Sequence, residues 1–478
     1  MTQVTPAAVA EQSLKMTAAR GAAWSALSSI ILRLGSFVVG IVLARLLTPE
    51  QFGVYAVALT VQSILMTVAD LGLSSDLIRS KEPEKLAPTI ATLGLISGGT
   101  MTALTIAASA PLATLMGSPE AAPAIAVLGV TLALGSVSLV PYAMLMRRFQ
   151  QRAMLLVGAV DFVVSTTVTL LLVLAGFGVM GLAVGRVAAQ LVSTILQFRL
   201  ARIRPKYGLD RSRLRPILSF GVPIAAANLL SWGLVNVDNV ILARIVGATA
   251  LGFYVLAFNV SGWPMNALSQ SVRAVSMPYF SRTSNAPSGL GVVTAIAWAG
   301  ALPAGVVLAV LSEPLIAVIY GDRWLPAAPV LAALGLYGAF RVLFDVFTGF
   351  LYAQGRARPV LWVQILWLIT LVTGMIIATD AYGIVGAGWV HAAVAGVVIL
   401  PAYIVVLRQA GVPAALLLRR AWWPTVATIP AAFAAWIGSR AVDTPIMALL
   451  IGGGASVVVY VLLMWAWGLR EWHRLRRE

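Results

Sequence analysis

The stretch VLARLLTPEQFGVYAVA, residues 42–58, decides the fold because most of its pattern occurs twice in the chain. It recurs without a gap as ILARIVGATALGFYVLA, residues 241–257. Each copy predicts a long apolar helix with an arginine at its far end, a short glycine-containing turn and a second apolar helix. A repeat built from several membrane-spanning helices is typical of proteins with two similar lobes that rock against each other.

The composition indicates that lipid is the solvent for most of the chain. Of its 478 residues, 60% are hydrophobic and only 10% are charged, whereas a soluble domain carries about 25% charged residues. The net charge of +16 does not indicate a nucleic-acid partner, because the basic residues lie in short loops between apolar runs, as in membrane topology signals. The chain has no cysteine, which excludes a disulfide framework and a cysteine nucleophile.

Apolar windows of about 20 residues, the length that spans a bilayer, predict an all-α integral membrane protein with fourteen transmembrane helices. We expect two six-helix lobes in a V around a central cavity, followed by two C-terminal helices. The windows are Ala22–Leu46, Val54–Leu73, Thr89–Met116, Ala122–Met144, Ala153–Ala175, Val179–Phe198, Ile217–Ile245, Leu251–Val275, Leu290–Leu311, Ala327–Tyr352, Val360–Ala378, Ile384–Leu407, Ala421–Ile437 and Pro445–Trp467.

The longest charged connection, RLARIRPKYGLDRSRLR at residues 199–215, is predicted to separate the lobes. The expected organisation begins with a cytoplasmic N-terminal segment (1–20), an N-lobe (21–198) and a basic inter-lobe loop (199–216). A C-lobe (217–408), two further helices (409–469) and a basic cytoplasmic tail (470–478) follow. A segment between the ninth and tenth helices, Ser312–Trp324, is predicted to lie at the membrane interface.

The distribution of Lys and Arg predicts the topology. If the N-terminus lies inside, the inner segments hold 26 of the 33 basic residues and the outer loops only Arg45, Arg244, Arg323 and Arg440. Cytoplasmic loops are enriched in Lys and Arg, so both termini are expected in the cytoplasm. No segment outside the membrane is long enough for a catalytic domain, so we expect neither an enzyme nor a cofactor.

Charged and amide side chains inside the spans give the candidate site, because they are costly in the bilayer and usually line a hydrated path. They recur at helical spacing, as in Arg186, Gln190, Ser193 and Gln197, and such stripes from both halves could line one water-filled cavity. The candidate substrate-binding residues are Arg33, Arg186, Arg341, Asn228, Asn239, Asn259 and Gln190, and the candidate ion-coupling residues are Asp161, Asp238 and Asp345.

Each of these residues also has a structural interpretation. Amide and small side chains at these spacings often hold membrane helices together, and Arg341 and Asp345 could neutralise each other one turn apart. Arg33 and Arg186 have no acid within their own helices, which favours a functional role or a pair with Asp161 or Asp238 on another helix. For His391, and for Gly181 and Gly185 in GLAVG, we expect core packing.

Three passages resemble one known family. ARLLTPEQFGVYAVAL (44–59), ADLGLSSDLIRSKE (69–82) and PLIAVIYGDRWLPAAPVLAALGLYG (314–338) are similar to segments of the polysaccharide transporter family, the Wzx-type flippases of lipid-linked oligosaccharides, within the multidrug/oligosaccharidyl-lipid/polysaccharide exporter superfamily. The resemblance covers residues 21–408 in matching order. A small apolar residue is more usual in this family where Asp76 stands.

The resemblance implies alternating access and a cargo of undecaprenyl-diphosphate-linked sugar units, moved from the inner to the outer leaflet of the bacterial cytoplasmic membrane for O-antigen, capsule or exopolysaccharide assembly. The arginines within the spans suit that cargo, because guanidinium groups bind phosphate oxygens in bidentate fashion. The expected partners are the lipid-linked oligosaccharide, membrane lipids and a polysaccharide polymerase or export complex.

Other functions stay open at this point. An ion-coupled MATE-like exporter of small molecules would need acids in excess of bases in the cavity, and a lipid II-type flippase shares the fold. A membrane-embedded polymerase or glycosyltransferase would need a large outer loop, and the connections here are too short for one.

Overall fold

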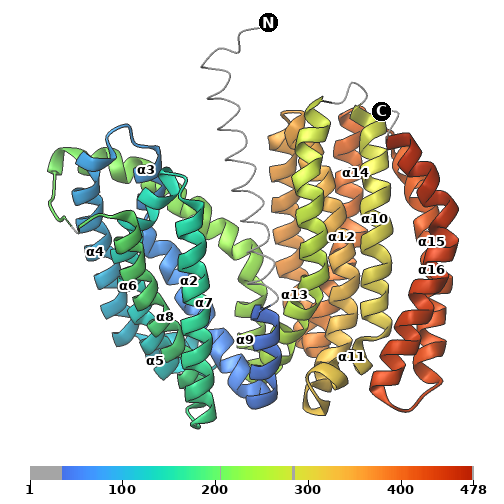
Figure 1. Cartoon of the computed structure of the whole chain (residues 1–478), viewed down its shortest axis with the longest axis horizontal. Helices are drawn as coiled ribbons and strands as arrows, with labels where there is room; N and C mark the ends of the chain where they lie inside the picture. Colours follow the sequence, from blue (N-terminus) through green and yellow to red (C-terminus); the bar gives the residue numbers. More distant parts are fainter. Residues whose placement is uncertain (1–34, 205, 283–285, 476–478) are drawn as a thin grey trace, which may run out of the picture. The chain divides into compact units, whose positions relative to one another are not determined.

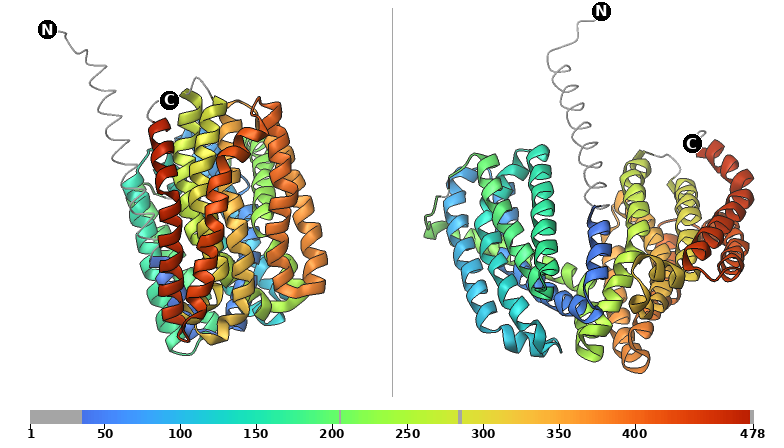
Figure 2. Two further views of the ribbon diagram at one scale, coloured as in Figure 1. Left: turned by 90° about the vertical axis from the view of Figure 1, so that its right-hand side faces the viewer. Right: turned by 60° about the horizontal axis from the view of Figure 1, so that its bottom comes forward.

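The computed structural model describes residues 35–204, 206–282 and 286–475, and helices joined by short turns make up this part of the chain (Figures 1 and 2). The predicted all-α class is therefore confirmed. The chain divides into two compact units, residues 1–240 and 241–478. The predicted inter-lobe loop, residues 199–216, lies ahead of this division, and residues 217–240 belong to the first unit.

The first unit is built around α6, which packs against α2, α3, α4 and α8, while α7 packs on α8. Leucines of α3 and α4 pack with Val140 and Met144 of α6 to form its core. The helices of this unit are Gly35–Leu46, α2 (Pro49–Asp70), α3 (Leu73–Arg79), α4 (Pro83–Ala107), α5 (Ser109–Leu115), η1 (Pro119–Ala121), α6 (Ala122–Arg147), α7 (Gln151–Leu174), α8 (Gly178–Ala201) and the first part of α9 (Arg211–Arg282).

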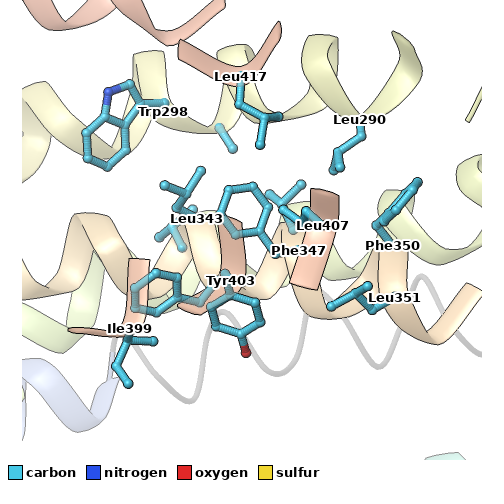
Figure 3. Close-up of a cluster of buried hydrophobic side chains, with 14 of the residues drawn as sticks. Leu290, Trp298, Leu343, Phe347, Phe350, Leu351, Ile399, Tyr403, Leu407 and Leu417 are labelled. Carbon is cyan, nitrogen blue, oxygen red and sulfur yellow. The ribbon is translucent and has the colours of Figure 1, made fainter. Parts of the chain in front are cut away.

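The second unit is built around α10 and α12, which pack on each other. α15 also packs on α10, and α16 packs on α15. Figure 3 shows its core, where Phe347 of α12 and Tyr403 of α14 lie between leucines of the neighbouring helices. After α9, the helices are α10 (Ala286–Val310), α11 (Ser312–Ile319), η2 (Asp322–Ala327), α12 (Ala328–Ala353), α13 (Ala357–Ala393), the π-helical turn η3 (Val394–Ile399), α14 (Leu400–Gln409), α15 (Ala414–Arg440) and α16 (Pro445–Leu475).

The two copies of the repeat break their helices at the same position. In the first copy the break is at Thr48, which has an extended backbone (φ −81°, ψ 158°) and forms a capping box with Gln51. In the second copy the corresponding residue is Gly247, with φ +80° and ψ 176°. The helix–turn–helix plan is confirmed, but the predicted glycine in both turns is wrong, because Gly53 of the first copy lies inside α2.

The chain is a multi-pass membrane protein. Eleven helices among the described residues are long and apolar enough to cross a bilayer. One of these segments, Ala357–Gln409, has 53 residues and would be about 80 Å long if straight, against a hydrocarbon core of about 30 Å. It is broken at Gly383 (φ +60°, ψ −146°), between the predicted spans Val360–Ala378 and Ile384–Leu407.

Two other predicted segments have a different local structure from a single regular helix. The window Thr89–Met116 is interrupted at Ala108, where α4 ends and α5 begins. Residues 312–324, predicted to be interfacial, form the short helix α11 and the start of the 3₁₀ segment η2.

Candidate functional site

Arg186 of α8 forms an ion pair with Asp161 of α7, with 3.1 Å between Nη1 and Oδ2. The hydroxyl of Ser193, two turns further along α8, donates to Oδ1 of the same carboxylate at 3.0 Å. We call these three residues the Arg186 cluster. An ion pair with an acid on another helix, Asp161 or Asp238, was one role expected for Arg186 from the sequence. The structure confirms such a pair with Asp161.

A tight hairpin positions the Arg186 cluster. The turn between α7 and α8 has positive φ at Gly176 and Gly178, which glycine adopts without steric cost. Further along, a Cβ atom at Gly185 would lie 2.1 Å from Oγ1 of Thr169 and 3.1 Å from the carbonyl oxygen of Ser165. The absence of a side chain at Gly185 thus lets α8 approach α7 closely, as predicted for the GLAVG segment.

In the Arg186 cluster, the guanidinium group keeps N–H donors that can bind a further anionic group. The side chains of Arg186 and Asp161 are 36% and 27% exposed, so neither is sealed in the core. A guanidinium group has five N–H donors, and within the part of the chain that the structure describes Arg186 donates one hydrogen bond, from Nη1 to Asp161. The remaining donors of Arg186 can form charge-assisted hydrogen bonds with an anionic ligand while Asp161 keeps the guanidinium in place.

The other described candidates of the first unit lie on α8 and α9. Gln190 is half-buried one turn after Arg186. On α9, Asn228 is exposed and Asn239 is half-buried, with its N–H donating to Oδ1 of Asp238 at 2.9 Å. Asp238 itself is buried, with 5% of its surface exposed.

One structural contact on α9 was not predicted. The indole N–H of Trp232 donates to the hydroxyl of Ser63 on α2 at 3.0 Å, and Asn236 donates to the carbonyl of Trp232. Trp232 lies one helical turn from both Asn228 and Asn236 in the sequence. Its position on the same helical face as these two amides could have indicated that the indole N–H takes part in a polar contact.

The second unit holds the remaining described candidates. Asn259 is exposed on α9, while Arg341 and Asp345 are half-buried on α12. His391 is 3% exposed and lies with its ring centroid 5.0 Å from that of Tyr337, which confirms the prediction of core packing. Arg33 lies outside the described residues.

Asp76, the departure from the family pattern, is buried at the start of α3 with 6% of its surface exposed. Its Oδ1 lies 2.8 Å from a guanidinium nitrogen of Arg79, and that guanidinium lies over the ring of Phe220 on α9, 3.3 Å from the centroid. The carboxylate in this position is thus satisfied by a neighbouring cation.

Several proteins are similar to this chain in sequence. The succinoglycan biosynthesis transport protein ExoT of Rhizobium meliloti (strain 1021) is 26% identical over 381 residues, which cover 79% of this chain and 76% of ExoT. The lipopolysaccharide biosynthesis protein WzxC of Escherichia coli (strain K12) is 27% identical over 72% of this chain and 71% of its own. The teichuronic acid biosynthesis protein TuaB of Bacillus subtilis (strain 168) is 23% identical, with 78% of each chain covered.

Solved structures show the same fold at lower identity. The lipid II flippase MurJ in an inward closed conformation superimposes with a TM-score of 0.75 at 13% identity, covering 92% of this chain and 98% of MurJ. An inward-facing multidrug resistance MATE transporter gives a TM-score of 0.62 at 18% identity, over 80% of this chain and 96% of its own. Residues 42–329 match a family model described as "Polysaccharide biosynthesis protein", and they span the predicted motif in both copies of the repeat. The chain belongs to this polysaccharide biosynthesis protein family.

Proposed function

We propose that the chain is a flippase that moves a lipid-diphosphate-linked oligosaccharide from the inner to the outer leaflet for surface polysaccharide assembly. The relatives support this substrate class, since ExoT is a succinoglycan biosynthesis transport protein and WzxC is a lipopolysaccharide biosynthesis protein. In this proposal the fourteen predicted spans form two six-helix lobes and two further helices, and the lobes give alternating access to the two leaflets.

The observation that carries the proposal is the Arg186 cluster. An arginine held by a carboxylate within a membrane-spanning segment, and still more than a third exposed, is a cation prepared for an anionic ligand in a medium of low dielectric constant. A diphosphate provides the oxygens that a guanidinium group binds best. Arg33 and Arg341 are further candidates for this role, with Asn228, Asn239, Asn259 and Gln190 for the sugar.

Export of an organic cation is less well supported by the same cluster. An acid that binds a cation needs a free negative charge, whereas both oxygens of Asp161 have a partner, in Arg186 and in Ser193. Asp161, Asp238 and Asp345 remain in our proposal as candidates for ion coupling rather than for binding the cargo.

The location in the bacterial cytoplasmic membrane with both termini inside is part of this proposal. Since the chain has no cysteine, single cysteines introduced for Leu209 and Arg323 can be labelled with a maleimide that does not cross membranes. In intact cells, label on Arg323→Cys alone is expected. Label on Leu209→Cys but not on Arg323→Cys would reverse the topology.

Paired substitutions test whether the Arg186 cluster serves substrate binding or only structure. Arg186→Ala leaves the charge of Asp161 without its partner and should abolish surface polysaccharide in a strain that depends on this chain. Arg186→Ala combined with Asp161→Ala removes both charges, and a purely structural pair would regain activity in this double variant. The proposal predicts that the double variant stays inactive while its amount in the membrane is normal, and recovery of polymer would refute it.

A further inference from the structure

The first unit contains a cavity of about 510 Å³ at the end of α4, α6 and α8 where the basic loop after α8 begins. The candidate residues of the Arg186 cluster do not line it. In Figure 1 the loop that follows α8 (green) lies beside α4, and hydrogen bonds between Thr92 and Gly208 join the two. One wall of the cavity is therefore formed by five residues of the basic connection, Arg202, Ile203, Arg204, Lys206 and Tyr207.

The lining of the cavity has two chemically distinct parts. Ala87, Pro88 and Ala91 of α4 with Val137, Val140 and Met144 of α6 form an apolar floor. Arg148, Arg202, Arg204 and Lys206 are the basic members of the lining, and Glu84 is its acidic member. Four cations face one anion, so the lining carries a net positive charge at neutral pH.

Hydrogen bonds between segments far apart in the sequence hold the walls in place. The hydroxyl of Thr92 receives the N–H of Gly208 at 2.9 Å, and the N–H of Asp210 donates to the hydroxyl of Thr89 at 3.2 Å. At the ends of α6 and α8, the guanidinium of Arg148 donates to the carbonyl of Ala201 at 2.9 Å. These bonds place the basic side chains over the apolar ends of α4 and α6.

The chain also turns sharply at the mouth of the cavity. Arg202 ends α8 in the left-handed conformation (φ +52°), which is uncommon for a residue with a side chain. This turn directs the following residues Ile203 and Arg204 back into the lining. The loop is thus folded against its own unit and does not simply extend from it.

We propose that this cavity binds the phosphate head group of an anionic membrane lipid, with the basic residues on the phosphate and the adjoining apolar part of the lipid on the floor. Charge-assisted bonds from arginine and lysine select a phosphate oxygen, and the volume falls within the range of about 300–1,000 Å³ that is usual for ligand sites. A soluble phosphate compound would not use the apolar floor, which lies at the ends of membrane-spanning helices.

The site is separate from the proposed transport function. It does not require that the lipid be the cargo, because Arg186 and Asp161 are not part of it. A lipid bound between the loop and α4 would fasten the connection between the predicted lobes to the first unit at the membrane surface.

Native mass spectrometry of the whole protein in detergent tests the proposal, with phosphatidylglycerol as the probe and phosphatidylcholine as the neutral comparison. The double variant Arg202→Gln/Arg204→Gln should lower the apparent affinity for phosphatidylglycerol at least tenfold. The matched control is Arg211→Gln/Arg215→Gln, which removes the same charge from exposed residues of the same region outside the cavity, and it should stay within twofold of the native protein.

Two further arms separate the sources of phosphate. Inorganic phosphate at millimolar concentration should not displace the lipid, and Ala91→Phe, which fills the floor, should weaken lipid binding while thermal stability in detergent stays close to that of the native protein. Equal loss in both double variants, equal binding of phosphatidylcholine, displacement by inorganic phosphate, or unchanged lipid binding by a folded Ala91→Phe variant would each overturn the proposal.

Discussion

At the scale of single residues, the pairing of Arg186 with Asp161 depends on the packing of two helices that have little room between them. The carboxylate accepts from both Arg186 and Ser193, and it can do so because small side chains let α7 and α8 approach. The polar cluster and the glycines of α8 are therefore parts of one arrangement.

Substitution of Gly185 tests that arrangement. Gly185→Ala would place a methyl group 2.1 Å from Oγ1 of Thr169 and 3.0 Å from its backbone nitrogen, so the helices must separate. We expect a loss of about 1–3 kcal/mol, the usual cost of overpacking, measured as a lower midpoint of thermal unfolding in detergent. Gly99→Ala on α4 is the matched control, because nothing lies within 4 Å of its added Cβ, and its midpoint should not fall. Equal midpoints for the two variants would contradict the close approach of α7 and α8.

At the scale of helices and loops, the two copies of the repeat interrupt their helices at the same position with different residues. Thr48 interrupts the helix with an ordinary extended backbone and caps α2 with its hydroxyl. Gly247, at the corresponding position, has a backbone conformation that is essentially restricted to glycine.

Replacing Gly247 should therefore be costly although the space around it is open. Nothing lies within 4 Å of a Cβ added there, so any effect comes from the backbone and not from a clash. We expect Gly247→Ala to lose about 1–3 kcal/mol, the typical cost of a strained backbone, seen as a lower unfolding midpoint. Gly454→Ala on α16, also without a neighbour within 4 Å and without positive φ, should be tolerated. If Gly247→Ala is as stable as Gly454→Ala, the break is not where we place it.

Arg213, at the start of α9, joins the end of the basic loop to the residue before α4 through two carboxylates that respond to pH. Its Nε lies 3.1 Å from Oδ2 of Asp210, and its Nη2 lies 3.8 Å from Oε2 of Glu82. Hydrogen bonds from the Ser212 hydroxyl and backbone N–H, together with Arg213, hold the pKa of Asp210 below its usual value. The hydrogen bond and charge of Lys85, with Arg213, do the same for the pKa of Glu82. Because both carboxyl pKa values are lower in the folded protein, their stabilising contribution is complete above the unfolded values of about 4 and is lost as pH falls through the folded values.

A spin label on Leu209→Cys, an exposed loop residue, measures this attachment. Its mobility should be low and constant from neutral pH to about pH 5 and should rise as the pH falls below about 4, where both carboxylates gain protons. The variant Asp210→Asn/Glu82→Gln should show raised mobility at neutral pH and little further change on acidification. An unchanged spectrum of the native protein down to pH 3, or a full transition in the double variant, would speak against attachment by these carboxylates.

At the scale of the whole molecule, the sequence predicted those features that depend on local pattern. The apolar windows, the helical repeat at residues 42–58 and 241–257, and the expectation of an acidic partner for Arg186 on another helix follow from residue type and helical spacing. Which of Asp161 and Asp238 is that partner depends on the packing of α7 against α8. The break in the first copy has a sequence signal that was missed, because Thr48, Pro49 and Gln51 form a capping-box pattern that marks a helix start. The second copy has no such pattern, and Gly247 in the turn and Gly252 in the following helix look alike in sequence.

The cavity beside α4 could not be predicted from the sequence, because the contacts that form it join residues far apart in the chain. The loop is held there by hydrogen bonds such as that between Thr92 and Gly208, which are 116 residues apart. No local pattern indicates which threonine will receive the N–H of a distant glycine, so the basic loop could be recognised only as a connection. Its role as a wall of a cavity depends on tertiary structure.

Translocation by the purified protein tests the proposed function most directly. The chain is placed in vesicles with lipid-diphosphate-linked repeat units extracted from the source cells, and sugar exposed on the outer surface is followed with a glycosidase that cannot enter. We predict faster exposure than in protein-free vesicles, a loss of at least tenfold in Arg186→Ala/Asp161→Ala, and a normal rate in the exposed-loop control Arg211→Gln/Arg215→Gln. A native rate equal to that of protein-free vesicles, or an unimpaired double variant of the Arg186 cluster, would contradict a flippase that holds its cargo at Arg186.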